Sequence, residues 1–87
     1  MDLNAFEKHH IQLKSPLLLI KGGKGILACG YLNIETFNKT GEVAAIVTGV
    51  RTHEDMLKAK VIAVSNAGRE AGIEIGMPGE DALKKFA

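Results

Sequence analysis

A glycine cluster between two apolar runs constrains the fold of this chain more than any other feature of its sequence. Residues 22–25 are Gly-Gly-Lys-Gly, and with Lys21 they separate an apolar run at residues 17–20 from a second run at residues 26–29. Two apolar runs flanking glycines indicate a β hairpin, and Pro16 is tolerated at the start or edge of a strand. The sequence therefore predicts that residues 17–21 pair antiparallel with residues 26–29.

Short helices and strands are predicted to alternate after this hairpin, which gives an α/β layer fold. Residues 43–47 are continuously apolar and lie between Gly41 and Gly49, as in a central strand covered on both faces. Asn33 and Thr52 are suitable N-caps for the helices that follow them. Helices are expected over residues 33–39, from Thr52 to Leu57 or Ala59, and over 66–71 and 79–86, with further extended segments over 11–14, 61–64 and 73–75.

Residues 61–64 fit two structures. The apolar spacing over residues 57–72 suits one long helix. A strand is favoured, because β-branched residues dominate residues 61–64 and Ser65 can cap a separate helix over residues 66–71.

The chain is short for an independent hydrophobic core. Its 87 residues predict a single domain, with a β region over about residues 1–30 and an α/β region over residues 31–87. A domain of this size buries only about 60% of its unfolded surface, and one cysteine excludes an internal disulfide. We therefore expect self-association through the N-terminal strands, whose apolar face is the one least covered by helices.

Charge and hydropathy disfavour several classes of partner. Lys and Arg number 11 against 10 Asp and Glu, with no block of like charge, so nucleic acid is not expected as a partner. Apolar runs such as residues 17–20 are too short to cross a bilayer or form a signal peptide, which makes a cytoplasmic location the default and a membrane partner unexpected. No cofactor or metal is expected, because His9 and His10 point opposite ways in an extended segment and have no third ligand nearby.

The only cysteine, Cys29, lies where a strand is expected to lead into a helix. Strand ends of this kind often carry the chemistry of α/β domains. A thiol enzyme or redox sensor would use Cys29 as its nucleophile, with His53 or Tyr31 as the proton partner. The alternative is a small buried side chain at the end of a core strand, which the usual burial of cysteine favours. No complete catalytic motif accompanies Cys29, so a catalytic role is disfavoured.

A second loop, residues 48–52, follows the predicted central strand. Arg51 and backbone N–H groups can form an anion site there, although turn geometry explains Gly49 equally well. If the strands ending near residues 29 and 47 are parallel neighbours, the loops that follow them lie together. The ligand-binding candidates in these loops are Gly30, Tyr31, Asn33, Thr48, Gly49, Arg51 and Thr52.

Three sequence blocks resemble a known family. They are residues 25–35, which include Cys-Gly-Tyr-Leu-Asn, residues 47–50, and residues 72–77, which read Gly-Ile-Glu-Ile-Gly-Met. On these blocks the chain resembles the YunC-like domain of unknown function, a family of small bacterial and archaeal proteins, over most of its length. The resemblance implies an α/β domain whose N-terminal β region mediates tetramer formation, and it implies no established activity. The resulting hypothesis is a non-catalytic oligomeric module that binds a small ligand or a protein partner through the two loops.

Overall fold

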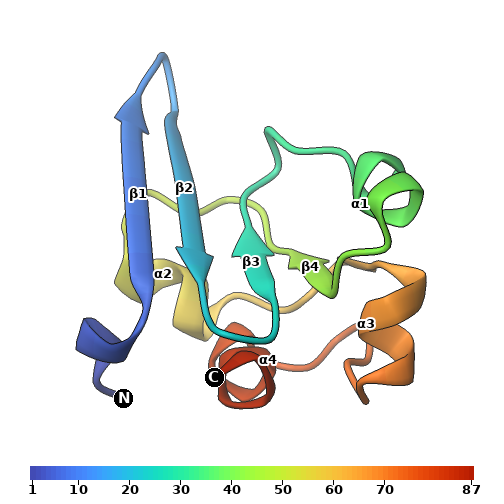
Figure 1. Ribbon diagram of the computed structural model, residues 1–87. Coiled ribbons are helices and arrows are strands. Elements are labelled where there is room, and N and C mark those ends of the chain that lie inside the picture. The colour runs from blue at the N-terminus through green and yellow to red at the C-terminus, as the bar shows by residue number, and fades with distance from the viewer.

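A mixed sheet of five strands in sequential order organises the structure, a computed structural model that describes residues 1–87 (Figure 1). Strands β1 to β3 form an antiparallel meander, β3 and β4 run parallel, and β4 and β5 run antiparallel. The strands are β1 Glu7–Gln12, β2 Pro16–Lys21, β3 Ile26–Ala28, β4 Ala44–Ile46 and β5 Ala63–Val64. The helices are a 3-10 turn at Leu3–Ala5, α1 Ile34–Thr40, α2 His53–Lys58, α3 Asn66–Glu70 and α4 Gly79–Phe86. The predicted α/β class, with an N-terminal hairpin followed by alternating elements, is confirmed.

The predicted pairing across the glycine cluster is present. Leu19 lies opposite Ala28 and Lys21 lies opposite Ile26. The glycines bring this turn against the end of α4, since a Cβ added at Gly22 would lie 2.2 Å from the Phe86 carbonyl oxygen. The turn therefore needs glycine because another chain segment approaches its backbone closely.

The first strand differs from its predicted position at residues 11–14. β1 begins at Glu7, and residues 13–15 form the bend that leads into β2. Every residue of β1 is exposed, and residues 7–10 are all polar, so no alternation of apolar and polar residues indicates where the strand begins. Backbone pairing with β2, from Glu7 opposite Lys21 to Gln12 opposite Pro16, defines it instead.

Helix caps were predicted well from local sequence. The side chain of Asn33 accepts a hydrogen bond from the Glu35 N–H at 2.9 Å, and Thr52 and Ser65 cap α2 and α3 in the same way.

The long-helix alternative for residues 57–72 is wrong, because β5 pairs with β4 between α2 and α3. β5 is shorter than predicted, since the Val61 N–H donates to the Met77 carbonyl outside the sheet.

The two faces of the sheet are covered unequally. α2 and α4 pack over a closed face, where side chains such as Leu18, Ile20 and Leu27 join a core cluster of 15 buried residues. The opposite face has a cluster of only four buried residues, around Phe37 of α1. No helix in the structure has the length and apolar character needed to cross a membrane.

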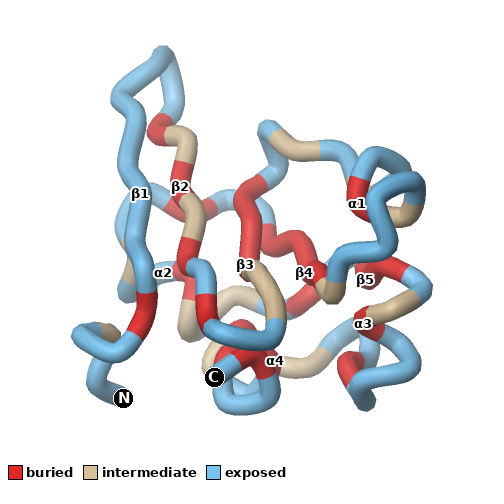
Figure 2. The backbone as a smooth tube through the Cα atoms, in the orientation of Figure 1, coloured by how far each residue is buried: buried red, intermediate tan, exposed pale blue.

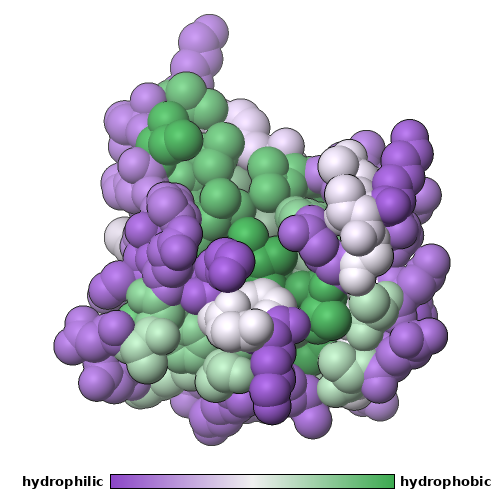
Figure 3. Space-filling view, viewed as in Figure 1, coloured by the Kyte–Doolittle hydropathy of each residue, from purple (hydrophilic) through white to green (hydrophobic).

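The uncovered part of that second face lies over the hairpin, and we call it the open face. Strand register places its apolar side chains on one side of β1, β2 and β3. Figure 2 shows β1 exposed along its length and β2 alternating between buried and intermediate residues, and Figure 3 shows apolar side chains gathered over this region. The open face comprises Ile11, Leu17, Leu19 and Ile26.

Candidate functional site

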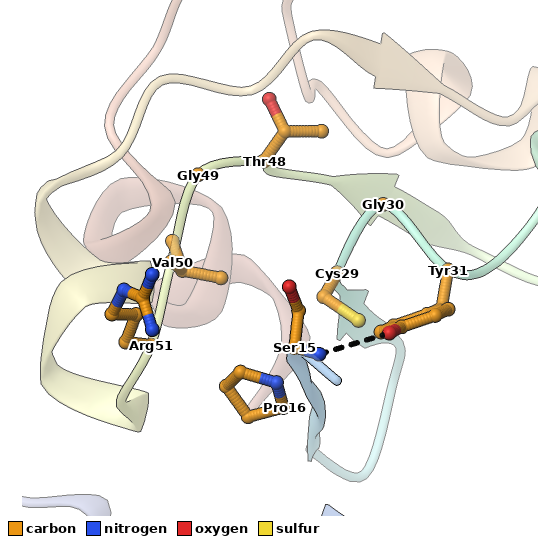
Figure 4. A pocket seen from close by; sticks show the side chains of 9 residues that line it. All are labelled: Ser15, Pro16, Cys29, Gly30, Tyr31, Thr48, Gly49, Val50 and Arg51. Atoms are coloured by element: carbon orange, nitrogen blue, oxygen red, sulfur yellow. Dashed lines mark hydrogen bonds between the residues drawn. The ribbon is translucent and has the colours of Figure 1, made fainter. Parts of the chain in front are cut away.

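The loops after β3 and β4 lie side by side. The two strands are parallel neighbours, with Ala28 paired to Ile46, so both loops leave the same edge of the sheet. A cavity of about 430 Å³ lies between them, and the bend between β1 and β2 supplies its third wall (Figure 4). We call this cavity the strand-end pocket. Its lining residues are Ser15, Pro16, Cys29, Gly30, Tyr31, Thr48, Gly49, Val50 and Arg51.

Most of the residues proposed from the sequence line this pocket. Gly30, Tyr31, Thr48, Gly49 and Arg51 are all on its wall. The remaining two candidates, the residues at positions 33 and 52, lie outside it and cap α1 and α2.

Sequence reasoning missed the contribution of the hairpin bend. Ser15 and Pro16 wall the pocket, and the Ser15 N–H donates a hydrogen bond to the Tyr31 hydroxyl at 3.3 Å. Ser15 and Tyr31 are 16 positions apart in the sequence, so no local pattern signals their contact. Val50 was missed as well, although its place between Gly49 and Arg51 in the predicted loop could have indicated it.

Cys29 is buried at the inner wall of the pocket, with only 3% of its surface exposed. Its thiol is free, and its sulfur accepts the backbone N–H of Leu18 at 3.3 Å. The Cys29 N–H in turn donates to the Leu18 carbonyl at 3.1 Å. These two bonds hold Cys29 against the hairpin strand.

His53 lies in a different cleft from Cys29. It shares that cleft with Lys8 and Glu54, and its Nε2 lies 2.9 Å from the His9 carbonyl oxygen. The ring of His10 stands edge-on to the His53 ring, with centroids 6.3 Å apart. No histidine, and no carboxylate, lines the pocket beside the cysteine.

The structure also contains no group of three or more His, Cys, Asp or Glu side chains placed to hold a metal ion.

Arg51 is the one charged residue on the pocket wall. Its guanidinium forms no ion pair in the structure, while its backbone N–H donates to the Asp55 carboxylate at 3.1 Å. In Figure 4 Arg51 and Tyr31 lie on opposite sides of the pocket, with the Ser15 hydroxyl between them.

Two glycines allow the loops to approach each other. A Cβ at Gly30 would lie 2.9 Å from the Thr48 methyl group, which is closer than side chains normally pack. Gly49 has a φ of 72°, in the left-handed region that favours glycine. Both glycines therefore shape the pocket through the backbone.

Comparisons with known proteins agree on one family. Residues 28–86 match the model of a family described as a domain of unknown function, DUF1805. The chain is 33% identical over 77 residues to the uncharacterized protein YunC of Bacillus subtilis, covering 84% of this chain and 76% of YunC. It also matches the crystal structure of a protein of unknown function, TA1206 from Thermoplasma acidophilum. That match has a TM-score of 0.83 at 37% identity and covers 94% of this chain and 93% of TA1206.

Proposed function

The chain belongs to the DUF1805 family, and on this premise we propose that it is a non-catalytic module that self-associates and binds a small ligand in the strand-end pocket. One observation carries the ligand-binding part of the proposal. The pocket of about 430 Å³ opens where two parallel strands end together. Ligands of α/β proteins bind preferentially at such strand ends, in cavities of roughly 300–1,000 Å³.

The composition of the wall supports binding without catalysis. A nucleophilic thiol normally needs a base within hydrogen-bond reach. The wall beside Cys29 offers hydroxyl groups, a guanidinium and apolar side chains, and His53 lies in another cleft. This arrangement can hold and orient a small molecule.

A screen for thermal stabilisation by small metabolites tests ligand binding. Ser15→Trp places a large side chain at the exposed wall of the pocket, while Lys14→Trp adds the same side chain at the neighbouring exposed residue, which does not line it. We expect a stabilising compound to lose its effect in Ser15→Trp and to keep it in Lys14→Trp. The proposal fails if no compound stabilises the protein, or if stabilisation survives in Ser15→Trp.

The alternative function, a thiol enzyme or redox sensor that uses Cys29, is favoured by one observation: Cys29 lines the pocket. The rate of iodoacetamide labelling as a function of pH distinguishes the two functions. A buried, hydrogen-bonded thiol is expected to react only after unfolding. Labelling of the native protein that a pocket ligand blocks would favour the thiol function instead.

The open face supports the self-association part of the proposal. Ile11 is 54% exposed, and Leu19 and Ile26 are only partly buried. An apolar surface of this kind on a small domain marks an interaction site, and β1 is an edge strand beside it. We propose that copies of the chain associate, as tetramers, through these N-terminal strands.

Light scattering at low micromolar concentration tests this association. Leu19→Lys introduces a charge on the open face, and Ile75→Lys makes the same change at a residue that is 56% exposed and lies outside the sheet. We expect a mass of several chains for the wild type and for Ile75→Lys, and a smaller mass for Leu19→Lys. A strictly monomeric wild type would contradict the proposal.

A further inference from the structure

We propose that the strand-end pocket binds the oxyanion of a small carboxylate or phosphate compound, with the Arg51 guanidinium as its main contact. The inference rests on the proposed ligand-binding function of the pocket and adds the chemical class of the ligand. Carboxylates and phosphates share the feature that matters here, at least two oxygens that accept hydrogen bonds from one guanidinium group.

The guanidinium on the pocket wall takes part in no ion pair. Arg51 is the one charged residue of that wall, and no carboxylate lies within 4.0 Å of the guanidinium, since the ion pairs of the structure are Glu7 with His9 and Glu80 with Lys84. Asp55, the acidic residue in contact with this loop, accepts the backbone N–H of Arg51. The guanidinium therefore keeps its five N–H donors free for a ligand.

The neutral groups of the wall are arranged to support a bound anion. The Ser15 hydroxyl points into the space between Val50 and Cys29 in Figure 4, where it can donate to an oxygen of the ligand. Pro16 and Val50 are buried and apolar, so the non-ionic part of the ligand has a surface to pack on. The pocket thus offers a charged end and an apolar wall within one cavity.

A small ligand fits this charge better than a polyanion. Long polyanions need rows of cations, whereas the pocket provides a single guanidinium in a chain with a net charge of +1. Arg51 itself is exposed, so an oxyanion can reach it without rearrangement of the core.

Titration with inorganic phosphate and with acetate, followed by amide and guanidinium NMR signals, tests the inference. We expect the signals of Gly30, Gly49 and Arg51 to shift and saturate with at least one of the two anions, and not with chloride at matched ionic strength. Saturation by phosphate alone assigns a phosphorylated ligand, and saturation by acetate alone assigns a carboxylate. Saturation by both assigns an oxyanion site that accepts either group.

Arginine variants provide the matched control. Arg51→Met removes the charge with little loss of length, and Arg69→Met makes the same change at the other arginine of the chain, which is exposed on α3. We expect Arg51→Met to weaken binding of the anion about tenfold or more, because it loses a charge-assisted bidentate contact. Arg51→Lys should retain part of the affinity, because it keeps the charge but loses the fork geometry.

Two results overturn the inference. One is equal weakening in Arg51→Met and Arg69→Met, which would indicate a general ionic effect. The other is the absence of saturation by either anion in a protein that neutral metabolites stabilise, which would leave the proposed ligand-binding function intact. If no compound of any class binds, the proposed function fails as well, so the two failures are distinguishable.

Discussion

Leu18 and Leu19 are neighbours on β2, yet they have different surroundings. Leu18 is completely buried on the closed face, within the 15-residue cluster under α2 and α4. Leu19 is only partly buried on the open face, at the margin of the four-residue cluster around Phe37. One apolar run therefore contributes to both faces of the sheet. Its closed face forms part of the core of the chain, and its open face is the surface that we propose as the interface between copies of the chain.

The largest effect is expected from alanine substitutions at these two residues. Leu18→Ala should lower the free energy of unfolding by about 2–5 kcal/mol, because it removes buried methyl groups and leaves a cavity. Leu19→Ala should cost about 1.5 kcal/mol or less in dilute protein, because its side chain is only partly removed from water. Urea unfolding monitored by circular dichroism measures both values.

The same pair of variants can contradict the comparison at a higher protein concentration. If the open face is an interface, the cost of Leu19→Ala rises with protein concentration, because assembly stabilises only the folded chain. A cost that is equal for the two variants at every concentration would show that the faces do not differ in function.

Local signals explain which parts of the fold were predictable from the sequence. The glycine cluster at residues 22–25 and the caps at Asn33, Thr52 and Ser65 act on neighbouring backbone, so short sequence windows contain them. The blocks on which the resemblance to the YunC-like family was based also lie in contiguous sequence, and the comparisons confirmed the family. β1 was misplaced because all of its residues are exposed and only long-range pairing defines it.

The site was predictable to the extent that it follows from strand direction. Both loops could be named from the sequence, but whether they meet depends on β3 and β4 being parallel neighbours. The contribution of Ser15 depends on how far the hairpin bend reaches over the body of the domain. That reach follows from tertiary packing, for which no short pattern exists.

A second matched pair tests how tightly the closed face is packed. A Cβ at Gly22 would lie 2.2 Å from the Phe86 carbonyl oxygen at the end of α4, while a Cβ at the adjacent Gly23 would have no neighbour closer than 3.8 Å. We expect Gly22→Ala to cost about 1–3 kcal/mol through forced backbone movement. Gly23→Ala should change stability by no more than about 0.5 kcal/mol. Thermal unfolding measures both, and equal effects would mean that α4 does not hold this turn.

A smaller effect is expected where the hairpin meets the pocket. Tyr31→Phe removes the hydroxyl that accepts the Ser15 N–H and keeps the aromatic ring. We expect a loss of stability of about 1 kcal/mol or less, because the contact is exposed. Amide hydrogen exchange at residue 15 should become faster, while amides of β2 on the closed face keep their protection. Unchanged exchange at Ser15 would show that the bend is not held to the pocket wall.

The smallest effect concerns Glu7, whose carboxylate lies on β1 at the polar margin of the open face. The hydrogen bond from the His9 imidazole is the largest cause of a lowered pKa of Glu7, followed by the positive charge of His9. Desolvation opposes the change, and the charge of Lys21, its partner across the strands, adds to the lowering. A folded-state pKa below the unfolded one means that Glu7 adds stability above the unfolded pKa. This contribution is lost as the pH falls through the folded-state pKa.

Carbon NMR of the Glu7 carboxyl group measures this pKa directly. We expect a titration midpoint below that of a glutamate in an unfolded peptide, about 4.3, and a rise toward the peptide value in His9→Gln. A midpoint that stays low without the histidine would contradict the assigned cause. The titration also bears on the two faces of the sheet, because Glu7 lies beside the open face. If association covers that margin, the midpoint depends on protein concentration, whereas burial on the closed face is complete within one chain and cannot produce such a dependence.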